Sequence, residues 1–189
     1  MARPLSEEKR EALLGAASDL IAQVGISAPT SKIAKAAGVS EGTLFTYFPT
    51  KDDLLNQLFI EIEAKLAETM SAPYPAESSS RERLFIVWSR LIEWGLSHST
   101  SRKTLSQLKV SDRVTSESRK HCYSMFLEAR SVVEQCLSGH AAIDRVDFYI
   151  DTILFDLADI TINAIAAKPN ERESIQLAGF ELFWKGTSL

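Results

Sequence analysis

The chain has 189 residues, 45% of them hydrophobic and 24% charged, with eight Gly, six Pro and a formal net charge of −4. This length suffices for one small and one ordinary domain with buried cores, and the scarcity of Gly and Pro favours long helices. No stretch approaches 18 consecutive apolar residues and no apolar run follows the first Arg, so we expect neither a membrane span nor a secretory signal, and a cytoplasmic protein.

The first predicted helix runs from Ser6 to Gly25. A serine followed by Glu7 and Glu8 favours a helix start, because the hydroxyl accepts an unpaired backbone N–H and acidic groups suit the helix dipole. Apolar residues then recur every three or four positions and form one face: Leu13, Ala16, Ala17, Leu20, Ile21 and Val24. This face should close the core over the next two helices.

Residues 30–51, TSKIAKAAGVSEGTLFTYFPTK, predict two short helices joined by a tight turn. Gly38 can adopt the left-handed conformation that ends the first helix, and Ser40 can cap the second. Leu44 and Phe48 turn inward four residues apart, which leaves small, hydroxylated and aromatic groups facing water. Most surface helices expose Lys and Glu instead, so the pattern favours a helix-turn-helix that touches the major groove of DNA.

The charge is distributed unevenly along the chain. Residues 1–51 hold six Lys and Arg against five Asp and Glu, and the remaining residues hold 15 against 20. The acidity therefore belongs to the C-terminal part, which would suit a body held away from phosphates. The basic excess is small, so we expect moderate DNA affinity with few Lys or Arg contacts.

The stretch AKAAGVSEGTLFTYFPTKDDLL resembles the signature segment of the TetR family of bacterial transcriptional regulators. The residues that carry this resemblance match the family's pattern by type and position: Gly38, Val39, Thr43, Leu44, Tyr47, Phe48 and Lys51. The resemblance covers about residues 10–60. Pro29 and Ser31 depart from the pattern by replacing a Thr or Ser and an Arg, which predicts a weaker phosphate contact there.

The resemblance implies an all-α fold of about nine helices. Residues 1–50 would form an N-terminal three-helix helix-turn-helix DNA-binding domain, and residues 51–189 a C-terminal helical domain for ligand binding and dimerisation. The residues predicted to face DNA are Thr30, Ser40, Glu41, Gly42, Thr43, Phe45, Thr46, Tyr47 and Lys51. Among them, Glu41, Gly42, Thr43 and Thr46 should meet base edges, and Ser40, Phe45, Tyr47 and Lys51 should contact the phosphate and sugar backbone.

The helices of the C-terminal part, residues 51–189, are predicted from the periodic spacing of their apolar residues. A helix from Lys51 to Ser71 is long enough to link two domains, and a loop rich in Pro and small polar residues follows at 72–80. Further helices are expected at residues 81–96, 102–110, 115–138, 141–167 and 171–185. Cys122 and Cys136 fall on the apolar stripe of the third of these, which predicts small buried thiols; a redox sensor would need exposed thiols of low pKa.

The last two helices are apolar on more than one side, which is more than a monomer can bury. We therefore predict a homodimer, and family members dimerise through a four-helix bundle of these helices. The residues assigned to the seam are Ile153, Leu157, Ile165 and Leu182. Such a dimer would bind a palindromic operator.

A small-molecule site is predicted in the body. Its candidate residues are Phe59, Trp88, Met125, Phe126, Phe155 and Asp159. Aromatic and thioether side chains are typical of pocket linings and also of plain cores, so both interpretations stay open. Asp156, Asp159 and Asn163 on the long helix could line a pocket for a cationic ligand, or a wet edge of the dimer seam.

Enzymatic activity is not expected. The three histidines are isolated from one another, and no phosphate-binding or nucleophile motif is present, so we predict no catalytic residues, metal or cofactor. The sequence therefore predicts a ligand-responsive transcriptional regulator, a repressor released from its operator by a small-molecule effector. The alternative is a DNA-binding protein of the same fold that is controlled by a protein partner or by no ligand.

Overall fold

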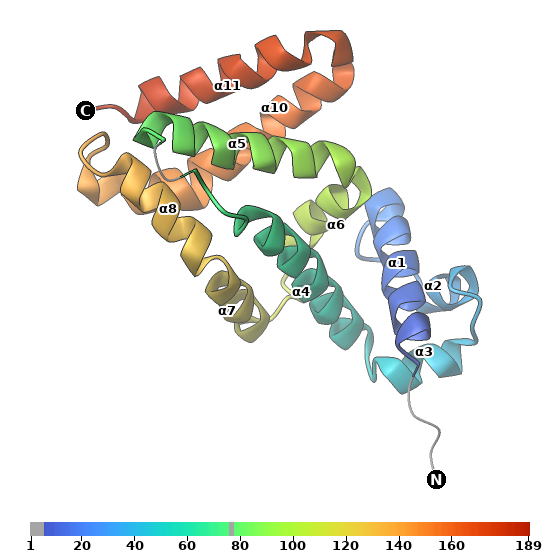
Figure 1. The fold of residues 1–189 in the computed structure, drawn as a ribbon. Helices are drawn as coiled ribbons and strands as arrows, with labels where there is room; N and C mark the ends of the chain where they lie inside the picture. The colour runs from blue at the N-terminus through green and yellow to red at the C-terminus, as the bar shows by residue number, and fades with distance from the viewer. Residues whose placement is uncertain (1–5, 76–77) are drawn as a thin grey trace. The chain divides into compact units, whose positions relative to one another are not determined.

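The computed structural model describes residues 6–75 and 78–189, and every regular element in this part of the chain is a helix (Figure 1). The longer helices are α1 (Glu7–Val24), α2 (Thr30–Ala36), α3 (Glu41–Tyr47), α4 (Lys51–Met70), α5 (Ser80–Ser97), α6 (Ser99–Lys109), α7 (Ser116–Met125), α8 (Leu127–Leu137), α10 (Phe155–Ala167) and α11 (Arg172–Thr187). Within these residues, no helix is long and apolar enough to cross a membrane. The all-α prediction is confirmed.

The chain folds as two compact units. Unit 1 comprises Met1–Lys65 and Ser99–Ser124, and unit 2 comprises Leu66–His98 and Met125–Leu189. Helix α4 begins in unit 1 and ends in unit 2. The sequence predicts a DNA-binding domain at residues 1–50 and a ligand-binding and dimerisation domain at residues 51–189. The two packed units do not test this assignment of functions, which stays a prediction.

Unit 1 is built around α1, which packs on both α2 and α6. The apolar face predicted for α1 is inward, with Leu13, Ala17 and Ile21 fully buried. Two buried hydroxyl groups join α1 to α6: the Thr104 hydroxyl lies 2.8 Å from the backbone oxygen of Ser18 and 3.2 Å from its side-chain oxygen. Helix α6 therefore belongs to the same packed body as the helix-turn-helix, although about 50 residues separate α3 from α6 along the chain.

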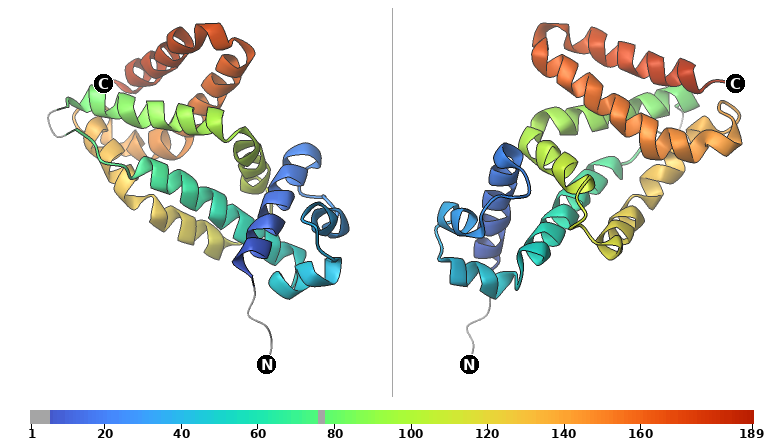
Figure 2. Two further views of the ribbon diagram at one scale, coloured as in Figure 1. Left: turned by 45° about the vertical axis from the view of Figure 1, so that its right-hand side comes forward. Right: turned by 180° about the vertical axis from the view of Figure 1, so that it is seen from behind.

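Unit 2 is a layer of α5, α10 and α11 with α8 packed on α5 (Figures 1 and 2). Its centre is the fully buried indole of Trp88, whose Nε1 donates to the backbone oxygen of Gln176 at 3.0 Å. Helix α11 approaches this indole at Gly179. A Cβ placed there would lie 2.9 Å from Trp88 and 2.5 Å from the hydroxyl of Thr161, so only glycine fits without a shift.

The predicted helix at 115–138 is wrong in one respect, because it is two helices. The backbone leaves the helical conformation at Phe126, with φ −95° and ψ 0°, and α8 begins at the next residue. This turn coincides with the passage of the chain from unit 1 to unit 2. Helix α7 buries only Ser118 and Cys122, whereas α8 buries an apolar stripe of Ala129, Val133, Cys136 and Leu137. Both cysteines are buried as predicted, Cys122 on α7 and Cys136 on α8. Burial raises the pKa of Cys122 to about 11.

The helix predicted at 141–167 is also wrong in its first half. It begins with a 3₁₀ turn at Ile143–Arg145 and the short α9 (Val146–Phe148), and continues as a π-helix over Tyr149–Leu154 before α10. The buried side chains of the π-helix and α10 are Ile150, Leu154, Ala158, Thr161, Ile162 and Ile165. A π turn holds more residues than the roughly 3.6 of an α-helical turn, and Ile150 and Leu154 are the buried residues within the π-helix.

Candidate nucleic-acid interface

Helices α2 and α3 meet through the tight turn that the sequence predicts. Gly38 adopts φ +70°, and the Ser40 side chain accepts a hydrogen bond from the Thr43 amide at 3.2 Å, which caps α3. Leu44 and Phe48 are buried, as is Ile33 of α2. The inward side of α3 is therefore fixed by the core, and this fixes which side chains point outward.

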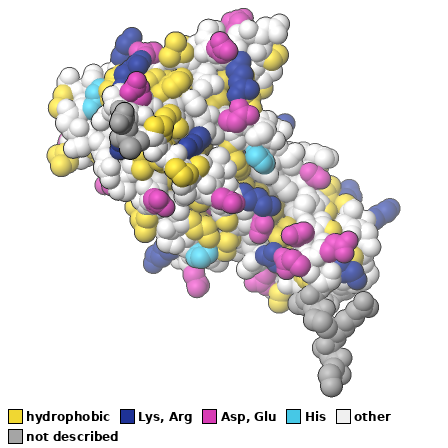
Figure 3. Space-filling view, viewed as in Figure 1, with side chains coloured by type: hydrophobic (Ala, Val, Ile, Leu, Met, Phe, Trp, Pro, Cys, Tyr) yellow, Lys and Arg dark blue, Asp and Glu magenta, His cyan; other side chains and the backbone are white. Residues whose placement is uncertain are grey.

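The residues predicted to face DNA come together on one part of unit 1, at the starts of α2 and α4 and along α3. Ser40, Glu41, Gly42, Phe45 and Thr46 are exposed, and the remaining four are partly buried. The aromatic ring of Phe45 is 41% exposed, although a ring of this size is normally buried in a core. On the face of the protein shown in Figure 3, basic and acidic side chains are interspersed.

Hydrogen bonds hold several of these side chains in place. The Thr30 hydroxyl donates to the Glu41 carboxylate at 2.6 Å and so joins the starts of α2 and α3. The Thr46 hydroxyl donates to the backbone oxygen of Gly42. The Tyr47 hydroxyl accepts from the Ser6 amide at 2.9 Å, which leaves its own proton available to an acceptor such as a phosphate.

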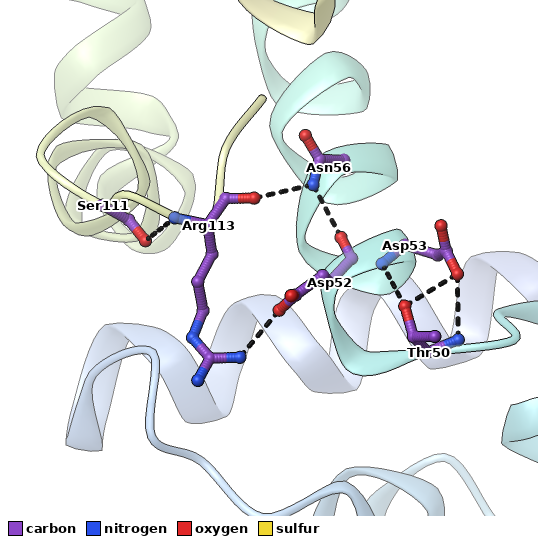
Figure 4. A network of polar contacts seen from close by, with 6 residues as sticks. All are labelled: Thr50, Asp52, Asp53, Asn56, Ser111 and Arg113. Atoms are coloured by element: carbon purple, nitrogen blue, oxygen red, sulfur yellow. Dashed lines mark hydrogen bonds and ion pairs between the residues drawn. The ribbon is translucent and has the colours of Figure 1, made fainter. Parts of the chain in front are cut away.

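The start of α4 lies next to α3 and carries Lys51. Thr50 and Asp53 cap this helix reciprocally: the Asp53 carboxylate accepts from the Thr50 amide at 2.9 Å, and the Thr50 hydroxyl accepts from the Asp53 amide at 3.1 Å (Figure 4). Partial burial and the nearby Arg113 guanidinium lower the pKa of Lys51. Arg113 comes from the connection between α6 and α7, and local sequence patterns gave no sign that it would lie here.

The six predicted ligand-binding residues are not gathered in one unit. Phe59 is buried in unit 1, and the other five belong to unit 2. Trp88 is a core residue of unit 2, whereas Met125, Phe126, Phe155 and Asp159 are partly exposed. Asp159 accepts from the Asn163 amide at 3.3 Å. Their role in binding a ligand stays a prediction.

Three of the four predicted seam residues line a groove on unit 2 with a volume of about 350 Å³. These are Ile153, Leu157 and Leu182, and the same groove includes Ile160. Ile160 and Leu182 are 65% and 64% exposed. Ile165 was assigned to the wrong side, because it is 2% exposed and continues the buried series of α10 into the core of its own unit.

The segment that contains α2 and α3 is similar to a known protein family. Residues 13–58 match the family described as "Bacterial regulatory proteins, tetR family". The fatty acid metabolism regulator protein of Bacillus subtilis is 37% identical over 79 residues, which are 41% of this chain and 41% of that protein. The match thus spans less than half the length of this curated relative.

Two solved structures are similar over almost the whole chain. A tetR family transcription regulator from Shewanella sp. PV-4 has a TM-score of 0.84 at 22% identity and covers 96% of this chain and 98% of its own. The regulator FadR from Bacillus subtilis, solved in complex with stearoyl-CoA, has a TM-score of 0.71 at 21% identity and covers 94% and 98%. These likenesses show that both units have a known fold.

Proposed function

We propose that the chain is a cytoplasmic transcriptional repressor of the TetR family that binds operator DNA as a homodimer, because its residues 13–58 match that family and its fold is similar to that of a solved regulator. The observation that carries the proposal is the outward face of α3, whose hydroxyl and aromatic groups are exposed while Leu44 and Phe48 hold the opposite side in the core. Thr43, Thr46 and Glu41 offer donors and acceptors to base edges. No catalytic role is assigned to any residue.

The exposed apolar face of α10 and α11 supports dimerisation. Ile160 and Leu182 lie there beside Phe148, which is 53% exposed, and a second copy would cover all three. A two-fold dimer carries two copies of α3, which can enter successive major grooves about 34–36 Å apart. The operator proposed for such a dimer is therefore palindromic.

Lys51→Ala tests the DNA-binding proposal. The substitution should weaken binding to every duplex by a similar factor and reduce the salt-dependence slope by about one per protomer, because a phosphate contact is lost. Thr46→Ala is the matched contrast, since it should change the preferred sequence and leave the slope unchanged. Both are measured by fluorescence anisotropy on duplexes selected from a random pool. Unchanged affinity of Lys51→Ala at two salt concentrations would remove Lys51 from the interface.

We further propose that a small-molecule effector releases the protein from DNA. Helix α4 supports this mechanism, because it starts beside α3 at Lys51 and continues into unit 2, so a change in its tilt would reach the DNA-binding side. Release requires that the effector bind the altered form better. A coupling of about 1–3 kcal/mol corresponds to about a 5- to 150-fold loss of operator affinity.

Linkage supplies the measurement for this mechanism. Operator DNA must weaken effector binding by the same factor by which the effector weakens operator binding. Stearoyl-CoA is a reasonable first probe, because a structure of similar fold was solved with it. Equal effector affinity with and without operator would remove the release mechanism and favour control by a protein partner or by no ligand. Tighter binding with operator would indicate a co-repressor.

A further inference from the structure

The connection between α6 and α7, residues 110–115, is fastened to α4 by the side chain of Asn56 (Figure 4). The amide nitrogen of Asn56 donates to the backbone oxygens of Arg113 at 2.9 Å and Asp52 at 2.8 Å. Its amide oxygen accepts from the Thr115 backbone amide at 2.9 Å and the Ser118 hydroxyl at 2.7 Å. All four hydrogen-bonding positions of the amide are used, so the connection is held in one register on α4.

This attachment places the Arg113 side chain at the start of α4. Its Nη1 lies 2.7 Å from the Asp52 carboxylate, and its backbone amide donates to the Ser111 hydroxyl at 3.1 Å. Arg113 and Asp52 are 48% and 54% exposed, and an ion pair this open to water contributes little to folding stability. A contribution to folding stability therefore does not explain why Arg113 and Asp52 are paired.

The charges around Lys51 supply that explanation. Lys51 is followed at once by Asp52 and Asp53, so the residues that start α4 carry one positive and two negative charges. Asp53 is occupied by the cap with Thr50, whereas Asp52 points to Arg113. Without Arg113, the Asp52 carboxylate would repel a phosphate approaching Lys51 and offset the attraction of that lysine.

We infer that Arg113 is a positioning residue for DNA binding, which neutralises Asp52 at the start of α4 and so preserves the attraction of Lys51 for a phosphate. The inference rests on the proposed function. It adds to the DNA-binding surface a residue from outside the segment 13–58 that matches the family. The lowered pKa of Lys51, caused first by burial and then by the charge of Arg113, agrees with two cations held close together.

Arg113→Ala in the full-length protein tests the inference. Affinity for a short fluorescein-labelled duplex of mixed sequence should fall by about three- to tenfold at ~50 mM salt and by less at ~200 mM, since binding of this kind is electrostatic and screened by salt. The melting temperature should stay unchanged. Arg113→Lys should retain most of the affinity, and Lys120→Ala, an exposed cation of α7 outside the network, should retain all of it.

The decisive variant is the double substitution Arg113→Ala with Asp52→Asn. If Arg113 acts through Asp52, removal of the carboxylate makes Arg113 dispensable, and the double variant should bind within about twofold of Asp52→Asn alone. Additive losses, or a lowered melting temperature that accounts for the weaker binding, would overturn the inference. If Arg113→Ala binds DNA with wild-type affinity while Lys51→Ala binds more weakly, the inference about Arg113 is overturned and the proposed function still holds. A wild-type protein that binds no duplex would overturn both.

Discussion

Leu182→Asp should convert the proposed dimer into folded monomers and abolish tight binding to the proposed operator. Leu182 is 64% exposed in the protomer, so an aspartate there costs little in the folded monomer. In the proposed dimer the same carboxylate would be buried without a partner, at a cost of about 3–5 kcal/mol, which weakens association at least about 100-fold. Sedimentation gives the oligomeric state, circular dichroism the fold, and anisotropy the operator affinity.

Leu127→Asp is the matched control, because Leu127 is an exposed leucine of α8 outside the groove, 52% exposed. It should leave the sedimentation behaviour unchanged. Ile165→Asp should behave differently from both, since it introduces a charge into the core of unit 2 and should unfold the protein. A soluble dimer of Leu182→Asp with normal operator affinity would show that the subunits meet elsewhere.

Gly179→Ala should lower the free energy of unfolding by about 1–3 kcal/mol, because the new methyl group overlaps two side chains. The Thr161 hydroxyl already donates to the backbone oxygen of Leu157, and the Trp88 indole is enclosed, so neither can move aside freely. The change would appear as a fall in melting temperature of about 2–12 °C.

Gly15→Ala is the control for Gly179→Ala. Gly15 lies within α1, and apart from its chain neighbours and the backbone of its own helix no atom lies within 4 Å of a Cβ placed on it. Alanine there should raise stability by about 0.5–1 kcal/mol through its better helix propensity. If both variants melt at the wild-type temperature, the close approach of α11 to Trp88 does not limit the stability of unit 2.

The features that were predictable from the sequence depend on local spacing. The ends of α1, the turn at Gly38 and the cap at Ser40 follow from residues within one or two helical turns, and the structure places each where it was predicted. The Ser6 hydroxyl, however, makes no capping hydrogen bond to α1. The exposed face of α3 follows in the same way, because Leu44 and Phe48 fix its orientation. Hydrophobic pattern and residue propensity are sufficient to predict the conformation of a segment when that conformation depends on its own residues.

The features that were missed depend on contacts between distant segments. Arg113 and Asp52 are 61 residues apart, and the charge pattern of neither segment indicates the other. Ile165 was assigned to the seam because α10 is apolar on two sides, and only packing decides which side faces α5 and α11. The π-helix over Tyr149–Leu154 was also missed, because a search for apolar residues at about 3.6 residues per turn assumes an α-helix throughout.

The hydroxyl contact between Ser18 and Thr104 has a consequence for protein engineering. A chimaera made by joining residues 1–65 to the body of another regulator would lose α6 from the surface of α1. It would uncover the part of α1 on which α6 packs and leave the Ser18 hydroxyl without this partner. An exchange of DNA specificity between relatives should therefore transplant residues 99–124 together with the amino-terminal helices, or replace only the outward side chains of α3.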